Sequence, residues 1–203
     1  MRDFPLFPLG IVALPGEVVP LHVFEERYKA MMARCLEEPS EFGIVWLSDD
    51  GLREVGCACE ITEVVDREED GRMNVLTRGT RPFQILQREE RLAYPAGTVE
   101  FLEDREEAVD GTIASVAREA YADLVERATD SRPEPPALAT MSAYDMAATV
   151  DFGPDVKQGL LDMRSENARL RLVTRLFRAA MKRLEFVSRA QARARSNGKV
   201  RFT

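Results

Sequence analysis

The sequence predicts an α+β fold: a closed or nearly closed antiparallel β-barrel with one early helix comes first, and helices follow it. Short apolar segments separated by turn residues fill residues 1–102. After Asp104 the apolar residues take up helical spacing instead. The chain has 203 residues, 45% of them hydrophobic, which is enough to bury a sizeable core. Strands followed by helices are typical of α+β proteins.

The N-terminal segment predicts two short strands and a helix. Residues 4–24 are apolar but interrupted by prolines, which exclude a helix interior, and Pro15-Gly16 is a turn signal. Two strands on either side of that turn are therefore expected. Residues 24–36 carry apolar side chains at the spacing of an amphipathic helix, and Pro39 ends it.

The next sixty residues predict a set of strands joined by hairpins. Asp70-Gly71 is a preferred pair for a tight hairpin turn. Pro82 is expected to separate two strands, the second of which begins after it. The expected strands are residues 43–47, 55–65, 73–79, 83–87 and 96–102. Short strands at such close spacing favour an antiparallel barrel.

The last hundred residues predict helices. The first is expected at 110–129, and a short one follows around 142–149. Pro154 is placed to begin the last and longest helix, which Gly198 follows. The expected buried face of the first helix comprises Ile113, Val116, Ala120, Leu124 and Ala128. That of the longest helix comprises Val156, Leu160, Met163, Leu170, Val173, Phe177, Met181, Leu184 and Val187. We expect a barrel domain over residues 1–108 and a helical domain with a basic C-terminal tail over 109–203.

The net charge of −7 disfavours non-specific binding of nucleic acid, but the charge is unevenly distributed. Residues 1–100 carry −8, residues 101–155 carry −9 and residues 156–203 carry +10. No acidic residue follows Glu185. Two interpretations stay open. The oppositely charged parts attract each other or show solvated faces, or the basic tail from Arg189 to Arg201 contacts nucleic acid or an acidic partner.

Cysteine content and the N-terminus predict a cytoplasmic protein. The three cysteines, Cys35, Cys57 and Cys59, are an odd and low count that does not suggest a disulfide framework, and a Cys57–Cys59 disulfide would be strained, so reduced thiols are expected. The longest uncharged run, residues 4–16, is short and interrupted by prolines, so no membrane span is expected. Residues 1–3 and those after them lack the pattern of a signal peptide.

A search for chemical motifs predicts a protein with no catalytic residue, no cofactor and no metal. His22 is the one histidine, and Cys57-x-Cys59 lacks the gap and the second ligand pair of a zinc site. No serine has a glycine two places before it, which excludes a nucleophile elbow. Gly198-Lys199 lacks the glycine of a phosphate-binding loop, because Arg193 stands there. We therefore expect a binding module rather than an enzyme.

Residues 4–28, FPLFPLGIVALPGEVVPLHVFEERY, resemble the opening of the N-terminal, substrate-binding domain of Lon proteases. That family's pattern is PLFPL, VLFPG and LPLHIFEPRY followed by a helix. Further elements follow in the family's order: FGIV at 42–45, VGCACEI at 55–61, DGR at 70–72, GTRPF at 79–83, YPA at 94–96, KQGLLD at 157–162 and RLRL at 169–172. Departures are few: Glu26 stands where the family usually has proline, and Cys57 and Cys59 replace threonine and a small residue.

The resemblance implies a PUA-like barrel followed by a helical bundle, and a role in engaging protein substrates. In full-length Lon proteases this region precedes an ATPase and a protease domain, and the chain is expected to act without either. We therefore expect it to bind unfolded or partly folded protein segments, or to act beside a protease or chaperone. The candidate partner-binding residues are Phe7, Leu9, Val12, Leu14, His22, Phe24 and Tyr28.

Two other functions stay open at this point. PUA-like barrels elsewhere bind RNA, and Arg78, Arg81 and the basic tail would serve that purpose here. A small-molecule enzyme would need an enclosed pocket around His22 with a perturbed acid nearby.

Overall fold

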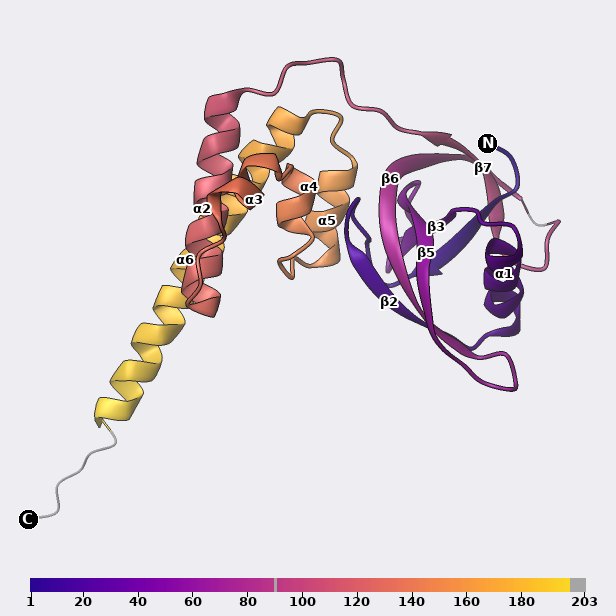
Figure 1. The fold of residues 1–203 in the computed structure, drawn as a ribbon, viewed down its shortest axis with the longest axis horizontal. Helices are drawn as coiled ribbons and strands as arrows, with labels where there is room; N and C mark the ends of the chain where they lie inside the picture. Colours follow the sequence, from indigo (N-terminus) through magenta and orange to yellow (C-terminus); the bar gives the residue numbers. More distant parts are fainter. Residues whose placement is uncertain (90, 198–203) are drawn as a thin grey trace, which may run out of the picture. The chain divides into compact units, whose positions relative to one another are not determined.

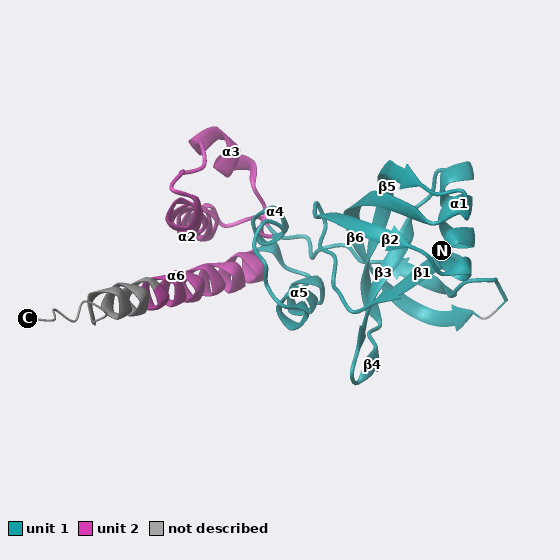
Figure 2. Cartoon of the chain, turned by 90° about the horizontal axis from the view of Figure 1, so that it is seen from below, with its two compact units in different colours: residues 1–107, 144–166 teal, residues 108–143, 167–203 magenta. Residues whose placement is uncertain are grey.

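The computed structural model describes residues 1–89 and 91–197, which form two compact units. Unit 1 comprises residues 1–107 and 144–166, and unit 2 comprises residues 108–143 and 167–203 (Figure 2). None of the helices in the described part of the chain is long and apolar enough to cross a membrane.

Unit 1 is built around a closed barrel (Figure 1). Its strands pair in the order β1-β7-β6-β5-β3, and β3 returns to β1. β2 lies off this ring and pairs with β6, while β4 pairs with β3. The elements are β1 (Phe4–Leu9), β2 (Val18–Val23), α1 (Glu26–Glu37), β3 (Phe42–Ser48), β4 (Gly51–Leu52), β5 (Val55–Arg67), β6 (Met73–Glu89) and β7 (Ala96–Phe101). The predicted barrel with one early helix is confirmed.

One pair in the ring is parallel, which the sequence did not predict. β1 pairs with β3 from Leu6↔Gly43 to Leu9↔Trp46, whereas the other pairs of the ring are antiparallel. A parallel pair needs a crossover connection. The long connection from β1 through β2 and α1 to β3 supplies it and so allows the barrel to close.

The prediction that Pro82 separates two strands was wrong, because β6 is continuous over 17 residues. The pairing of β5 with β6 shifts by one residue between Ala58 and Cys59, which leaves Thr80 as an extra residue on β6. A proline is tolerated in a strand near such a bulge. The Thr80 hydroxyl lies 3.1 Å from the carbonyl oxygen of Ala58 and holds the bulge in place.

The barrel interior is filled by aromatic and aliphatic side chains. The rings of Phe4 and Phe83 meet edge to face at 5.2 Å, and Phe101 meets Phe4 at 5.7 Å. Gly43 leaves room for this packing, because a Cβ there would lie 2.3 Å from the Phe83 ring. The buried cluster comprises Phe4, Leu6, Val45, Ala58, Phe83, Ile85 and Val99.

The segment of residues 144–166 belongs to unit 1 although it follows unit 2 helices in the chain. It contains most of α4 (Ala143–Ala147) and all of α5 (Pro154–Leu161). Lys157 bonds Glu17 at 2.5 Å, and Gln158 donates to the carbonyl oxygen of Val55 at 3.1 Å. The chain first passes from unit 1 to unit 2 after Glu107, next to the boundary expected at 108, but the barrel unit also takes in this later segment.

A single long helix from Pro154 was expected, and that expectation was wrong. α5 ends at Leu161 and α6 (Glu166–Asn197) begins five residues later. The Gln158 side chain donates to the Asp162 carboxylate, and Arg164 donates to the carbonyl oxygen of Leu161. The Arg164 bond satisfies a carbonyl at the end of α5, and the Gln158–Asp162 bond joins two side chains across its last turn. Gly198, expected beyond the helix end, lies outside the described residues.

Unit 2 contains α2 (Gly111–Thr129), α3 (Pro135–Thr140) and α6. Asp110 caps α2, its Oδ1 accepting from the amides of Thr112 and Ile113 at 2.8 and 3.1 Å. Tyr121 of α2 packs on Phe177 of α6, with 5.4 Å between ring centroids.

The predicted buried face of α2 was partly wrong. Ala120 and Leu124 are buried as expected, but Val116 is 40% exposed and alanines at 114 and 117 are buried instead. Small side chains allow close helix packing, and a search for large apolar residues undervalues them.

Candidate functional site

Unit 1 contains an open pocket of about 500 Å³ beside the start of α1, hereafter the α1 pocket. The segments that form it are the end of β1, the end of β2 with the first turn of α1, the β3–β4 hairpin, and the residue before β7. The lining residues are Phe7, Pro8, Leu9, His22, Val23, Phe24, Glu25, Arg27, Tyr28, Leu47, Leu52 and Pro95. Both the volume and the apolar lining are in the range of ligand-binding pockets.

The mouth of the pocket carries large apolar side chains that are left in solvent. Residues of β2 alternate between exposed and buried, which turns His22 outward and Val23 inward. Phe24 follows and is 58% exposed. Across the pocket, Leu47 and Leu52 pair in the β3–β4 hairpin, and Leu47 is 52% exposed. Exposed phenylalanine and leucine side chains on one apolar hollow are typical of a binding surface.

The inner wall of the pocket is aromatic. The Phe7 and Tyr28 rings lie 4.2 Å apart, and Phe7 also packs on Phe42 at 6.3 Å. Burial raises the pKa of the Tyr28 phenol; Arg27 opposes this shift and Glu25 adds to it. The phenol therefore keeps its proton at neutral pH. Its hydroxyl has no hydrogen-bond partner among the residues that the structure describes, so it can donate to an occupant.

Polar groups at the rim already have partners. The Arg27 guanidinium bonds the Glu25 carboxylate at 2.8 Å and lies 4.6 Å from the centre of the Tyr28 ring. His22 Nδ1 lies 2.8 Å from the Asn74 side-chain oxygen, and the His22 ring stacks on Phe24 at 5.7 Å. These contacts orient the rim side chains around the apolar opening.

The structure brings five of the seven candidate residues together in this pocket and leaves two outside it. Phe7, Leu9, His22, Phe24 and Tyr28 line it. Val12 and Leu14 lie in the β1–β2 connection and are 4% and 0% exposed. The Leu14 amide donates to the Glu17 carboxylate at 2.9 Å, which fits a role in packing. That any of the seven contacts a partner stays a prediction.

Sequence reasoning missed the opposite wall of the pocket. Leu47 and Leu52 follow α1 in the chain, and the unpredicted β1–β3 pairing places their hairpin across the pocket from the end of β1 and the start of α1. The signal was the pair of leucines flanking Ser48-Asp49-Asp50-Gly51, whose turn residues favour a tight hairpin with an apolar pair. The other lining residues that were missed are Pro8, Val23, Glu25, Arg27 and Pro95.

The arrangement supplies apolar contacts and hydrogen-bonding groups. No serine or cysteine lines the pocket. The three cysteines are buried and unpaired with one another, and burial raises the pKa of the thiols of Cys57 and Cys35, which keeps both protonated. Within the described residues no group of three histidine, cysteine or acidic side chains could hold a metal ion.

The barrel arginines proposed for RNA are differently placed. Arg81 bonds Glu41 at 2.7 Å and lies 3.7 Å from the centre of the Phe101 ring. Its charge is therefore already neutralised by a carboxylate and its plane is stacked. Arg78 is exposed on β6.

Comparison with known proteins places this chain in a family. The model of the ATP-dependent protease La (LON) substrate-binding domain matches residues 3–179. The chain belongs to this family. The Lon protease of Paraburkholderia phytofirmans is 26% identical over 186 residues, which are 80% of this chain and 22% of that protein. The chain thus spans about a fifth of the length of the curated relative it matches.

Solved structures of Lon N-terminal domains share the fold. The Lon N-terminal domain protein of Xanthomonas campestris is 25% identical with a TM-score of 0.65, over 84% of this chain and 96% of that one. The N-terminal domain of the Mycobacterium avium complex Lon protease is 21% identical with a TM-score of 0.64, over 87% and 98%. The family match, over residues 3–179, therefore covers the barrel and most of the helices that follow it in the chain.

Proposed function

We propose that this protein is a non-catalytic recognition module that binds exposed apolar segments of other proteins through the α1 pocket. The observation that carries the proposal is the pair of exposed side chains, Phe24 and Leu47, on a preformed apolar hollow. An unfolded protein offers such segments, whereas a folded one buries them. Membership of a substrate-binding domain family supports the same role.

The energetics suit a weak and reversible interaction. Burying one phenylalanine or leucine side chain contributes about 1.5–3 kcal/mol, and the pocket has room for a few such groups. Ordering a flexible client opposes binding and leaves a modest net affinity. Weak, reversible binding of this kind is what an adaptor in protein quality control needs. The proposed role is therefore that of an adaptor that acts in the cytoplasm beside a protease or chaperone.

The proposal is tested with a fluorescent, permanently unfolded client protein and the full chain. Replacing Leu47 with serine is expected to weaken binding about tenfold, because it removes about one buried apolar side chain. Leu86→Ser is the matched control, since Leu86 is 59% exposed on β6 and lies outside the pocket lining. Equal binding by both variants, or no binding by the natural chain, would rule out the α1 pocket as the client site.

A further inference from the structure

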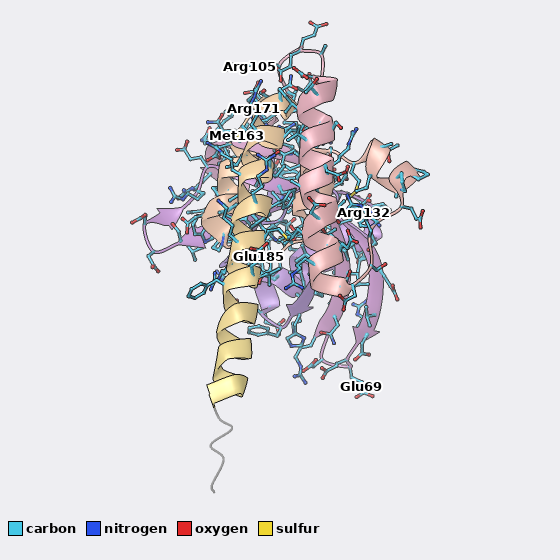
Figure 3. All side chains as sticks on the ribbon, turned by 90° about the vertical axis from the view of Figure 1, so that its left-hand side faces the viewer. Glu69, Arg105, Arg132, Met163, Arg171 and Glu185 are labelled. Atoms are coloured by element: carbon cyan, nitrogen blue, oxygen red, sulfur yellow. The ribbon has the colours of Figure 1, made fainter. Side chains whose placement is uncertain are left out.

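Unit 2 presents a straight row of basic side chains along α6. Arg171, Arg175, Arg178 and Lys182 follow one another at intervals of four, three and four residues, which places them on one face of the helix. All four are exposed. α6 runs past α2 in Figures 1 and 3, and Figure 3 labels Arg171 near the start of the helix.

The four cations of this row have no carboxylate partner in the part of the chain that the structure describes. Glu119 and Asp123 of α2 line a hollow with Arg178 and Lys182, but their carboxylates bond Arg132 at 2.5 and 2.9 Å. Some arginines elsewhere do have a carboxylate partner, among them Arg27, Arg72, Arg81, Arg91 and Arg132.

An exposed aromatic ring continues the row. Phe186 lies four residues after Lys182 and therefore on the same face of α6. It is 75% exposed, and no aromatic or cationic group contacts it within the described part of the chain. The row from Arg171 to Phe186 is about 22 Å long at 1.5 Å per residue.

Charge is also divided between the two units. By sequence, unit 1 carries 28 acidic and 14 basic residues, a net of −14. Unit 2 carries 7 acidic and 14 basic residues, a net of +7. The total of −7 therefore does not describe the surroundings of α6. A local positive field of this kind attracts polyanions.

We propose that this face of α6 binds single-stranded nucleic acid, with the four cations on phosphates and Phe186 stacked on a base. Guanidinium groups match phosphate oxygens in a bidentate way. A single strand is favoured over a duplex because its bases have free faces for an aromatic ring to stack on. An acidic protein segment or a lipid headgroup would bind the four cations, but neither has a base for the Phe186 ring to stack on.

The test is the fluorescence anisotropy of a labelled 15-nucleotide single strand with the full chain between 50 and 200 mM salt. Four neutralised phosphates at about −0.7 each predict a slope of about −2.8 for log affinity against log salt. Arg175→Gln/Arg178→Gln is expected to halve that slope. Phe186→Ala is expected to weaken binding about tenfold and leave the slope unchanged.

Control variants and competing ligands distinguish single-stranded nucleic acid from other anionic ligands. Arg2→Gln/Arg67→Gln removes the same charge from exposed positions of unit 1 and is expected to have little effect. Three results would overturn the proposal: no binding of the single strand at 50 mM salt, equal binding of poly-glutamate or anionic vesicles, or unchanged affinity in Phe186→Ala. Because all the substituted residues are exposed, each variant is expected to fold. The far-ultraviolet circular dichroism spectrum of each variant, compared with that of the natural chain, checks this.

Discussion

The ion pair between Glu17 and Lys157 is predicted to attach the helical segment of residues 144–166 to the barrel. Each side chain is only 14% exposed, and Lys157 Nζ lies 2.5 Å from Glu17 Oε1. At an effective dielectric constant of about 20, the attraction is about 7 kcal/mol, and desolvation of both ions offsets most of it. We expect a net coupling of about 2 kcal/mol.

Each single substitution is expected to lower the free energy of unfolding by more than the net coupling energy of the ion pair. Lys157→Met leaves a nearly buried carboxylate whose remaining partner is the Leu14 amide, at a cost of about 3 kcal/mol. For a chain of this length that lowers the melting temperature by about 6–12 °C. In the double variant Glu17→Gln/Lys157→Met the loss is expected to fall short of the sum of the two single losses by about 2 kcal/mol.

Urea unfolding followed by tryptophan fluorescence measures these free energies in unit 1, because Trp46 is the single tryptophan and lies in β3. Glu26→Gln is the surface control: Glu26 bonds Lys29 but is 89% exposed, so a loss below about 0.5 kcal/mol is expected. A coupling energy for Glu17 and Lys157 below about 0.5 kcal/mol, the loss expected for the surface control, would refute the reasoning.

Three further predictions concern the core, a surface carboxylate and the thiols. Phe83→Ala is expected to destabilise the protein by about 3–5 kcal/mol in urea unfolding, because the ring is fully buried against Phe4; a loss below 1 kcal/mol would contradict this. Hydrogen bonds from Arg91 and Thr98 lower the pKa of Glu89 to about 2, so its stabilising effect is present above the unfolded-state pKa and is lost as pH falls toward 2. Arg91→Gln is expected to move the Glu89 titration, followed by carboxyl NMR, back toward the usual range, and an unchanged titration would count against the contact. The three buried cysteines are expected to resist an aromatic disulfide reagent in the native protein and to react fully in guanidinium; rapid labelling without denaturant would show that the core opens.

The sequence predicted the elements of the barrel better than their connections. Alternating burial and turn residues are local signals, so β2, α1 and the Asp70-Gly71 hairpin could be recognised. The β1–β3 pairing and the return of residues 144–166 to the barrel depend on contacts between distant segments. Lys157 and Glu17 are 140 residues apart, and neither position has a local signature of the bond.

The same division explains the candidate site. The aromatic wall of Phe7 and Tyr28 and the exposed Phe24 lie within one continuous segment, and they could be proposed from it. The Leu47 and Leu52 wall required the ring closure. Val12 and Leu14 resemble the other candidates in composition, yet they are buried in the β1–β2 connection. Whether an apolar side chain belongs to the core or to a binding surface depends on its exposure. That exposure depends on neighbours from distant parts of the chain, which local sequence does not show.

Net charge shows how an average over the chain can mislead. A total of −7 argues against nucleic acid only if every part of the surface carries a similar charge. At physiological ionic strength charges are screened beyond about 8 Å, so a bound phosphate responds to the cations beside it rather than to distant carboxylates. The row on α6 is about 22 Å long, well over one screening length. Its affinity for a polyanion therefore depends on the four local cations and on salt, which is why the salt slope of the Arg175→Gln/Arg178→Gln variant, rather than the overall charge, decides the question.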